Sequence, residues 1–326
     1  MRILIASRHR YPADNGEGTG WGPRAFPSGS GFHILDLTVR GLAELGHDVV
    51  YLLPQGWDRE MSLPVTMVKE PRFDVDLAHV LDYLENDLLY AMEQQGVPTI
   101  VSCHRDPHLT GEERGLTGDN WIYVSQSLAE AFESRRFVLN GLDPEDYIFG
   151  DDKQDYLLFM AALEWAPAKG LDLALSLARE AGIKLVVAGT GQTKEMIARV
   201  GALCQLHGAD FVGDVRGRDK ARLFASATAF LFPTQVAEAF GLCMVEAMMS
   251  GTPVIASDLG ACPEIVTPDV GFVCRTRDDY LVAIARCRDI PPERCRSKAL
   301  HRFHYKRMVA DYVREYQVEL DRRRGV

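Results

Sequence analysis

Short apolar runs alternate with amphipathic stretches through the first half of the chain. The apolar runs predict five strands, at residues 2–7, 48–53, 75–80, 99–102 and 121–124. Apolar positions three to four residues apart predict helices between them, at residues 32–45, 81–95 and 126–135. Repeated strand–helix–strand units favour a parallel sheet with helices on both faces.

The pattern restarts after a polar, acidic stretch at residues 151–155. Strands are then predicted at residues 156–161, 184–188, 210–212, 229–232 and 253–256, and helices at 171–181, 194–207, 220–227 and 241–249. We therefore predict two doubly wound, Rossmann-like α/β domains, residues 1–150 and 151–326. We expect the last helix, about residues 305–326, to cross back to the first domain. Ligands of such folds bind beyond the carboxyl ends of the strands, which would place them in a central cleft faced by both domains.

Composition excludes several classes of protein. The 326 residues are 47% hydrophobic and 25% charged, which argues against disordered and coiled-coil chains. No apolar run approaches the roughly 18 residues that span a bilayer. The seven cysteines form no C-x-x-C pair, which favours reduced thiols over disulfides or a zinc site. We expect a soluble, cytoplasmic protein.

Charge is distributed unevenly. Residues 1–150 carry 12 Lys and Arg against 23 Asp and Glu, an acidic balance that repels nucleic acids and anionic membranes. Residues 294–326 carry 10 against 4, a pattern more typical of a solvated C-terminal helix than of a membrane anchor. We expect neither a nucleic-acid partner nor membrane association.

The most informative segment runs from residue 233 to residue 255 and contains Glu238 and Glu246. Eight residues rise about 12 Å along a helix, so these carboxylates cannot share one proton or one metal ion. They can hold two parts of one elongated ligand, with a diphosphate at the helix-opening amides of Phe240, Gly241 and Leu242. Alternatively, Glu238 caps the helix and Glu246 is a surface residue. The apolar neighbours of Glu246 favour ligand contact, because an unpaired buried carboxylate is costly.

This segment resembles the retaining family-4 glycosyltransferases of the GT-B fold (glycosyl transferases group 1), in which a Glu-x7-Glu element runs into Gly-Thr-Pro-Val. Further segments resemble the family in the family's own order, at residues 74–79, 99–104, 140–143, 157–160, 169–172, 187–191 and 211–214. The resemblance covers nearly the whole chain. It implies two Rossmann-like domains and transfer of a sugar from a nucleoside diphosphate sugar.

The resemblance also implies roles for individual residues. Glu246 would bind the ribose hydroxyls of the donor, and Glu238 the hydroxyls of the transferred sugar. Lys169 would neutralise the departing diphosphate. His104 would lie near the reacting face of the donor sugar, although a histidine at a strand end is more often structural.

Two further sets of residues lie in the glycine-rich segment 15–31. Gly29 and Gly31 resemble the glycine pair that lets the backbone approach the donor phosphates closely. Trp21, Arg24 and Phe26 are candidates for the acceptor-binding surface.

The chain departs from the family at Ala161 and Ala162, where the family has Gly-Arg. Loss of one preorganised donor costs about 2.7–4 kcal/mol of transition-state stabilisation. Arg216, Arg24 and Arg105 are candidate replacements, and we hypothesise that Arg216 compensates because it follows a strand end.

Other interpretations of the motifs are weaker. Asp74 and Asp76 form a D-x-D, but within a predicted strand, and a carboxylate pair alone is weak evidence for a metal ion. Gly189-Thr-Gly191 lacks the third glycine and the acidic residue of a dinucleotide site. We therefore predict no metal and no cofactor.

The resemblance implies a retaining, metal-independent hexosyltransferase that moves a sugar from a UDP- or GDP-linked donor to an acceptor hydroxyl. Two alternatives stay open. One is a GT-B nucleotide-sugar epimerase or phosphorylase-type enzyme, and the other is a non-catalytic nucleotide-sugar-binding module.

Overall fold

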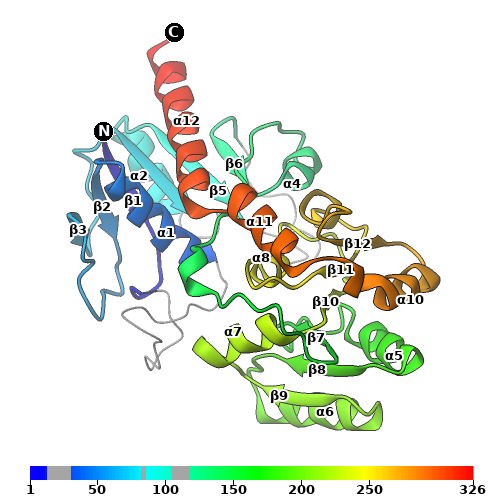
Figure 1. Ribbon diagram of the computed structural model, residues 1–326. Helices are drawn as coiled ribbons and strands as arrows, with labels where there is room; N and C mark the ends of the chain where they lie inside the picture. The colour runs from blue at the N-terminus through cyan, green and yellow to red at the C-terminus, as the bar shows by residue number, and fades with distance from the viewer. Residues whose placement is uncertain (13–30, 82–85, 105–117, 326) are drawn as a thin grey trace. The chain divides into compact units, whose positions relative to one another are not determined.

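The structure is a computed structural model that describes residues 1–12, 31–81, 86–104 and 118–325 (Figure 1). The described residues pack into two compact units. Unit 1 contains residues 1–12, 31–143 and 303–325 with the gaps just named, and unit 2 contains residues 144–302.

Unit 1 is built on a six-stranded parallel sheet with the order β3-β2-β1-β4-β5-β6. Its strands are β1 (Arg2–Ala6), β2 (Asp48–Leu52), β3 (Val65–Val68), β4 (Leu77–Leu81), β5 (Thr99–Cys103) and β6 (Trp121–Tyr123). Every residue of β4 and β5 is buried. Burial on both faces explains why these strands are continuous apolar runs.

The helices of unit 1 are α1 (Gly31–Glu44), α2 (Asn86–Gln94), α4 (Gln126–Ala131) and α12 (Tyr305–Arg324). A backbone hydrogen bond from Leu142 N to Phe303 O, 2.8 Å, and one from Tyr305 N to Leu142 O, 3.0 Å, lead the chain into α12. The Tyr305 hydroxyl then donates to the carboxylate of Glu44 on α1. Tyr312 and Tyr316 of α12 are buried in unit 1.

Unit 2 repeats the same architecture with the order β12-β11-β10-β7-β8-β9, again all parallel. Its strands are β7 (Tyr156–Met160), β8 (Lys184–Ala188), β9 (Asp210–Gly213), β10 (Ala229–Phe232), β11 (Val254–Ser257) and β12 (Gly271–Cys274). Its helices are α5 (Leu171–Ala181), α6 (Lys194–Leu206), α7 (Gly217–Ser226), α8 (Leu242–Met249), α9 (Cys262–Ile265), α10 (Arg277–Arg286) and α11 (Pro292–Arg302), with the 3₁₀ turns η1 (Pro144–Asp146) and η2 (Cys287–Asp289).

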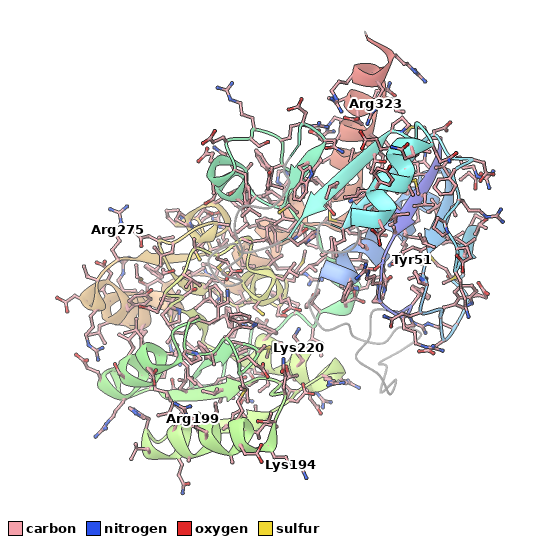
Figure 2. The ribbon with its side chains drawn as sticks, turned by 180° about the vertical axis from the view of Figure 1, so that it is seen from behind. Tyr51, Lys194, Arg199, Lys220, Arg275 and Arg323 are labelled. Carbon is pink, nitrogen blue, oxygen red and sulfur yellow. The ribbon has the colours of Figure 1, made fainter. Side chains whose placement is uncertain are left out.

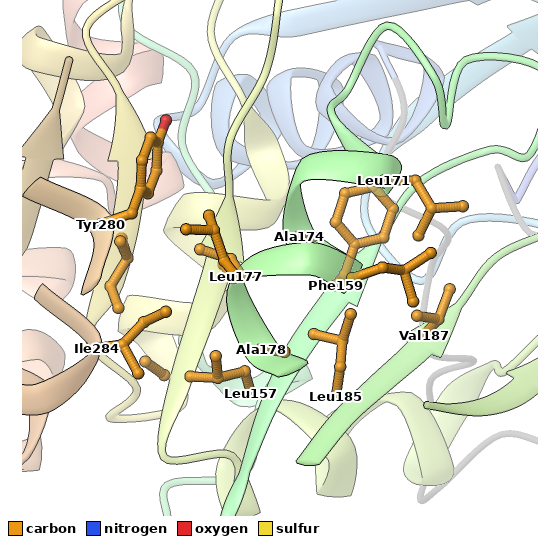
Figure 3. Packing of buried hydrophobic residues seen from close by; sticks show 14 of the residues in the cluster. Leu157, Phe159, Leu171, Ala174, Leu177, Ala178, Leu185, Val187, Tyr280 and Ile284 are labelled. Atoms are coloured by element: carbon orange, nitrogen blue, oxygen red, sulfur yellow. The ribbon is translucent and has the colours of Figure 1, made fainter. Parts of the chain in front are cut away.

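The core of unit 2 lies between its sheet and α5 (Figure 3). Leu171 and Leu177 of α5 pack with Phe159 of β7 and Leu185 of β8, and Ile284 of α10 closes the cluster. This packing explains the spacing of apolar positions that predicts α5, because that spacing gathers them on one helix face.

The ten predicted strands are confirmed within one or two residues at each end. Two strands were not predicted. β3 has only four residues, half-buried or exposed, and lies at a sheet edge, and β12 is an edge strand of four residues.

Three helix predictions need correction. For the helix predicted at 81–95, the structure gives α2 as Asn86–Gln94, and Leu81 belongs to β4. The helix predicted at 126–135 ends at Ala131, and Glu133 adopts a positive φ of 57°. The helix predicted at 220–227 begins three residues earlier, at Gly217.

Candidate functional site

The strand order of unit 2 marks where a ligand would bind. β7 pairs with β10, and from this pair the chain winds outward in opposite directions, to β8 and β9 on one side and to β11 and β12 on the other. In doubly wound sheets ligands bind beyond the carboxyl ends of the strands at such a switch point. Lys169 lies on the segment that follows β7, and Glu238 on the segment that follows β10.

Lys169 and Glu238 form an ion pair at this switch point. Lys169 Nζ donates to Glu238 Oε2 at 2.5 Å, and the two side chains are only 13% and 12% exposed. The Nζ also lies 5.8 Å from the centroid of the Phe232 ring at the end of β10. The pair therefore places a cation and an anion side by side in a largely desolvated position.

Gly170 makes the close approach of the two segments possible. Its φ is +84°, and a Cβ built on it would lie 2.0 Å from the carbonyl oxygen of Pro233. Any side chain would push the segment after β7 away from the segment after β10. On the other side of Glu238, its carbonyl oxygen accepts from Ala261 N at 2.8 Å. Both side chain and backbone of Glu238 are thus held in place.

The start of α8 lies three residues beyond Glu238. Phe240 is buried, Gly241 is the N-cap residue with φ +83°, and Leu242 is the first helical residue. No side chain caps this N-terminus. The alternative that Glu238 caps the helix is therefore wrong, because its carboxylate is bonded to Lys169. Backbone N–H groups at a helix start favour an anion.

Glu246 lies on α8 and is 1% exposed. Its Oε1 accepts from Lys220 Nζ at 2.8 Å and from the Tyr147 hydroxyl at 3.2 Å. Its Oε2 is buried without a hydrogen-bond partner within the described part of the chain. The alternative of a surface residue is therefore wrong. The premise of an unpaired carboxylate needs correction as well, because Lys220 supplies a charge partner at Oε1. Ligand contact by Glu246 stays a prediction.

Sequence reasoning missed Lys220 and Tyr147. Lys220 lies on α7, where Gly217, Ala221 and Phe224 are buried, so a lysine on an apolar helix face was the available signal. Figure 2 shows Lys220 among the side chains of unit 2, whereas the exposed Lys194 lies on α6 at its edge. Tyr147 follows η1 and carried no comparable signal.

The protonation states around Glu246 follow from its surroundings. Burial lowers the pKa of Lys220, but Glu246, Cys243 and Asp214 together outweigh burial, and the net shift is upward. Burial and the neighbouring Glu246 raise the pKa of Tyr147 well above its usual value and that of Cys243 to about 12. At neutral pH the cluster therefore contains one ammonium group, with a neutral phenol and a neutral thiol.

His104 follows β5 in unit 1. Its Nε2 is buried without a hydrogen-bond partner in the described ranges, and burial lowers its pKa to about 4. In β4, burial and nearby His104 lower the pKa of His79 to about 3, and His79 Nδ1 lies 2.8 Å from the Tyr316 hydroxyl. Both imidazoles are therefore neutral at pH 7. The role of His104 toward a donor sugar stays a prediction.

Arg216 is the N-cap residue of α7 and pairs with Asp214 at 2.6 Å. It follows β9, which β8 separates from β7 in the sheet. Its side chain is 42% exposed, and its proposed compensation for Ala162 stays a prediction.

Of the remaining predicted site residues, the structure describes Gly31, which is the first residue of α1. Gly29, Trp21, Arg24, Phe26 and Arg105 lie outside the described residues. Within the described ranges, no group of three or more His, Cys, Asp or Glu side chains is placed to hold a metal ion. In the same ranges no helix combines the length and apolar character that a bilayer crossing requires.

Residues 148–296 match the family described as glycosyl transferases group 1. The phosphatidyl-myo-inositol mannosyltransferase of Mycobacterium leprae is 31% identical over 144 residues, which are 41% of this chain and 38% of that protein. The chain thus covers well under half the length of this curated relative. The sequence similarity concentrates on unit 2, which holds the Lys169–Glu238 and Lys220–Glu246 pairs.

Solved structures show the fold of the whole chain. AviGT4, a glycosyltransferase involved in avilamycin A biosynthesis, superposes with a TM-score of 0.75 at 24% identity over 98% of both chains. Anabaena HepE in complex with UDP and glucose gives 0.67 at 15% identity, over 98% of this chain and 100% of that one. The predicted fold is confirmed: two doubly wound parallel sheets, as in GT-B glycosyltransferases.

Proposed function

We propose that this protein is a glycosyltransferase that transfers a hexose from a nucleoside diphosphate sugar, UDP- or GDP-linked, to an acceptor hydroxyl. The match of residues 148–296 to the glycosyl transferases group 1 supports the reaction class. The relative that is a mannosyltransferase and the fold neighbour that binds UDP and glucose support the kind of donor. We further propose family 4, retention of the anomeric configuration and independence from metal ions.

The observation that carries the proposal is the Lys169–Glu238 pair beside the N-terminus of α8, at the switch point of the unit 2 sheet. A nucleoside diphosphate sugar has two parts that need opposite partners. Its diphosphate needs cations and N–H donors, and its sugar needs hydroxyl acceptors. A lysine, a helix start and a carboxylate lie together here, which supplies all three.

The chemistry proposed for these residues is electrostatic. As the glycosidic bond to the diphosphate breaks, negative charge grows on the leaving phosphate and positive charge on the sugar. Lys169 Nζ and the amides near Gly241 would stabilise the phosphate, in a position where low exposure strengthens their effect. Glu238 would accept hydrogen bonds from sugar hydroxyls, and Glu246 from the ribose.

The existing ion pair sets a condition for binding. Lys169 is already bonded to Glu238, so a diphosphate must share or take over this ammonium group. Glu238 is then released to accept from a hydroxyl. Sugar and diphosphate would therefore bind cooperatively, and a sugar nucleotide would gain more than its separate parts.

The reaction that retention implies needs no protein base. The leaving phosphate can take the proton of the acceptor hydroxyl on the same face of the sugar. His104, neutral at pH 7 because burial lowers its pKa to about 4, is proposed to contact the donor sugar as a hydrogen-bonding group rather than as a cation. The acceptor is proposed to be a soluble, neutral or cationic hydroxyl compound.

The cysteines support the proposed cytoplasmic location. All seven are free, and six of them are buried. Reduced thiols in this number fit a reducing compartment.

The test is release of nucleoside diphosphate from a panel of UDP- and GDP-linked hexoses, with and without acceptor sugars, in the presence of EDTA. We expect acceptor-stimulated release with one donor, unaffected by EDTA, and a product whose anomeric proton signal shows retention. Binding of a sugar nucleotide without any release over hours would instead identify a non-catalytic module. A change in the donor sugar without transfer would identify an epimerase.

A further inference from the structure

We propose that Lys220 and Tyr147 are positioning residues: they hold one oxygen of Glu246 so that its other oxygen is presented to the vicinal hydroxyls of a ribose. This inference rests on the proposed function, because it assumes that a nucleoside diphosphate binds in unit 2. It concerns two residues that no motif of the sequence singles out.

Three separate elements converge on one carboxylate. Glu246 comes from α8, Lys220 from α7, and Tyr147 follows η1. Lys220 Nζ at 2.8 Å and the Tyr147 hydroxyl at 3.2 Å both donate to the same atom, Oε1. The carboxylate is therefore fixed in rotation by two donors from different directions.

The second carboxylate oxygen of Glu246, Oε2, lacks such donors. Glu246 Oε2 is buried and has no hydrogen-bond partner within the described part of the chain. A buried acceptor left unsatisfied is costly, so native structures rarely retain one without a reason. Here both donors sit on Oε1 although Oε2 belongs to the same group. This asymmetry marks Oε2 as the position that a ligand completes.

The charge state defines the class of ligand. The Lys220 side chain is 12% exposed and forms an ion pair with Glu246, and the carboxylate of an ion pair is an acceptor only. The missing partner must then be a donor. An oxygen with two free lone pairs fits the two hydroxyls of a cis-diol, so the cluster would select ribonucleotides over deoxyribonucleotides.

The other groups around Glu246 do not replace Lys220. Cys243 lies three residues before Glu246 on α8. Burial, the charge of Glu246 and a side-chain hydrogen bond to Glu246 raise the pKa of its thiol to about 12, so the thiol is a neutral, weak donor to Glu246. Tyr147 is neutral as well. Asp214 and Asp146 contribute negative charge near Lys220 and Tyr147. Lys220 is the cation that forms an ion pair with Glu246.

A purely structural role would be that Lys220 only ties α7 to α8. The two roles differ in what they predict for ligands. If Lys220 only connects the two helices, its replacement should change the affinity for every nucleotide equally. If Lys220 positions Glu246, its replacement should change the affinity only for nucleotides that carry the ribose hydroxyls.

The experiment measures binding of UDP, GDP and their 2′,3′-dideoxy forms to the full chain by calorimetry. The variants are Lys220→Met, Lys220→Arg and Tyr147→Phe. Lys184→Met is the matched control, since Lys184 also pairs with a carboxylate in unit 2 but is 52% exposed. We expect the unmodified protein to prefer the ribonucleotide about 10-fold or more.

Lys220→Met should lower ribonucleotide affinity about 10-fold and leave dideoxynucleotide affinity unchanged. Tyr147→Phe should act in the same direction by about 2- to 5-fold, and Lys220→Arg should restore part of the loss.

Equal losses for both nucleotide forms, or no loss, would overturn the positioning role while leaving the proposed function intact. If neither UDP nor GDP bound the unmodified protein, the proposed function would fail and this inference with it. A thermal melt shows whether Lys220→Met folds. If it does not, the ribo-to-dideoxy ratio of Tyr147→Phe decides alone.

Discussion

Lys169 and Glu238 lie 69 positions apart in the chain, yet Lys169 Nζ and Glu238 Oε2 are 2.5 Å apart. The fold brings them together because β7 and β10, the strands that precede them, are neighbours at the switch point of the sheet. Each residue is the charge partner of the other, so the proposed ligand contacts would compete with this ion pair.

Replacing Lys169 by Met should reduce turnover about 100- to 1,000-fold, the range for removal of one preorganised charge-stabilising donor. It should also cost about 1–3 kcal/mol of stability, because Glu238 is only 12% exposed and loses its partner. Steady-state rates and urea unfolding measure the two effects. Glu238→Gln combined with Lys169→Met should recover part of the stability but none of the activity.

Introducing an arginine at Ala162 should raise turnover. Ala162 follows β7 and is exposed. It occupies the position at which the family that the sequence resembles has an arginine. A new guanidinium group beside the diphosphate would restore part of the stabilisation, and we expect an increase of about 5-fold or more, with Ala162→Gln as the neutral control. An unchanged rate in Ala162→Arg would mean that the position does not face the diphosphate.

Replacing Arg216 by Ala tests whether it compensates for Ala162. We expect donor affinity and turnover to fall about 10-fold. Stability should change by less than about 1 kcal/mol, because the Arg216–Asp214 pair is well exposed. Activity equal to that of the unmodified protein would show that the diphosphate has another cation.

Acid should destabilise unit 1 through His79 and His104. Their pKa values lie at about 3 and about 4, mainly because burial disfavours the charged form, against about 6.5 in the unfolded chain. At pH values between about 4 and 6.5 the unfolded state binds more protons than the folded state. The free energy of unfolding therefore decreases as the pH falls below about 6.5. At pH 5 the two groups together contribute a slope of roughly 2–3 kcal/mol per pH unit.

Urea unfolding at pH 7, 6 and 5 measures this slope. His79→Asn should reduce it by about half, and His301→Asn, at an exposed position of α11, should not. A slope identical in His79→Asn and the unmodified protein would show that other groups cause the acid sensitivity.

Gly170→Ala should destabilise unit 2 strongly. The positive φ costs about 1–2 kcal/mol for any other residue, and the new Cβ would also lie 2.0 Å from Pro233 O. Gly182 is a matched control, with φ +65° but no atom within 4 Å of a built Cβ. Gly182→Ala should therefore show only the conformational cost in a thermal melt. Equal losses in the two variants would show that the contact with Pro233 relaxes freely.

The sequence predicted the central strands of both sheets because each is a buried apolar run between polar breaks. β3 and β12 were not predicted, whereas the equally short edge strands β6 and β9 were, so length and edge position alone do not explain the difference. The correct start of α2 depends on Leu81, which is apolar and suits either a strand end or a helix start. The local sequence pattern cannot distinguish a strand end from a helix start at Leu81, because the pairing of β4 with β5 determines which one forms.

For the candidate site, the pattern identified which residues carry chemistry but not their partners. Glu246 was singled out by its apolar neighbours, yet its partner Lys220 lies 26 positions earlier on another helix. No spacing rule connects the two, because the contact arises only when α7 and α8 pack. The same holds for Lys169 and Glu238.

The return of the chain to unit 1 has a consequence for biosynthesis. Residues 303–325 pack with unit 1, and His79 of β4 contacts Tyr316 of α12. A ribosome that adds about 5–20 residues per second leaves the nascent first unit waiting tens of seconds for that helix. The described residues of unit 2, 144–302, are contiguous, so unit 2 depends on no described segment translated after them, whereas unit 1 does.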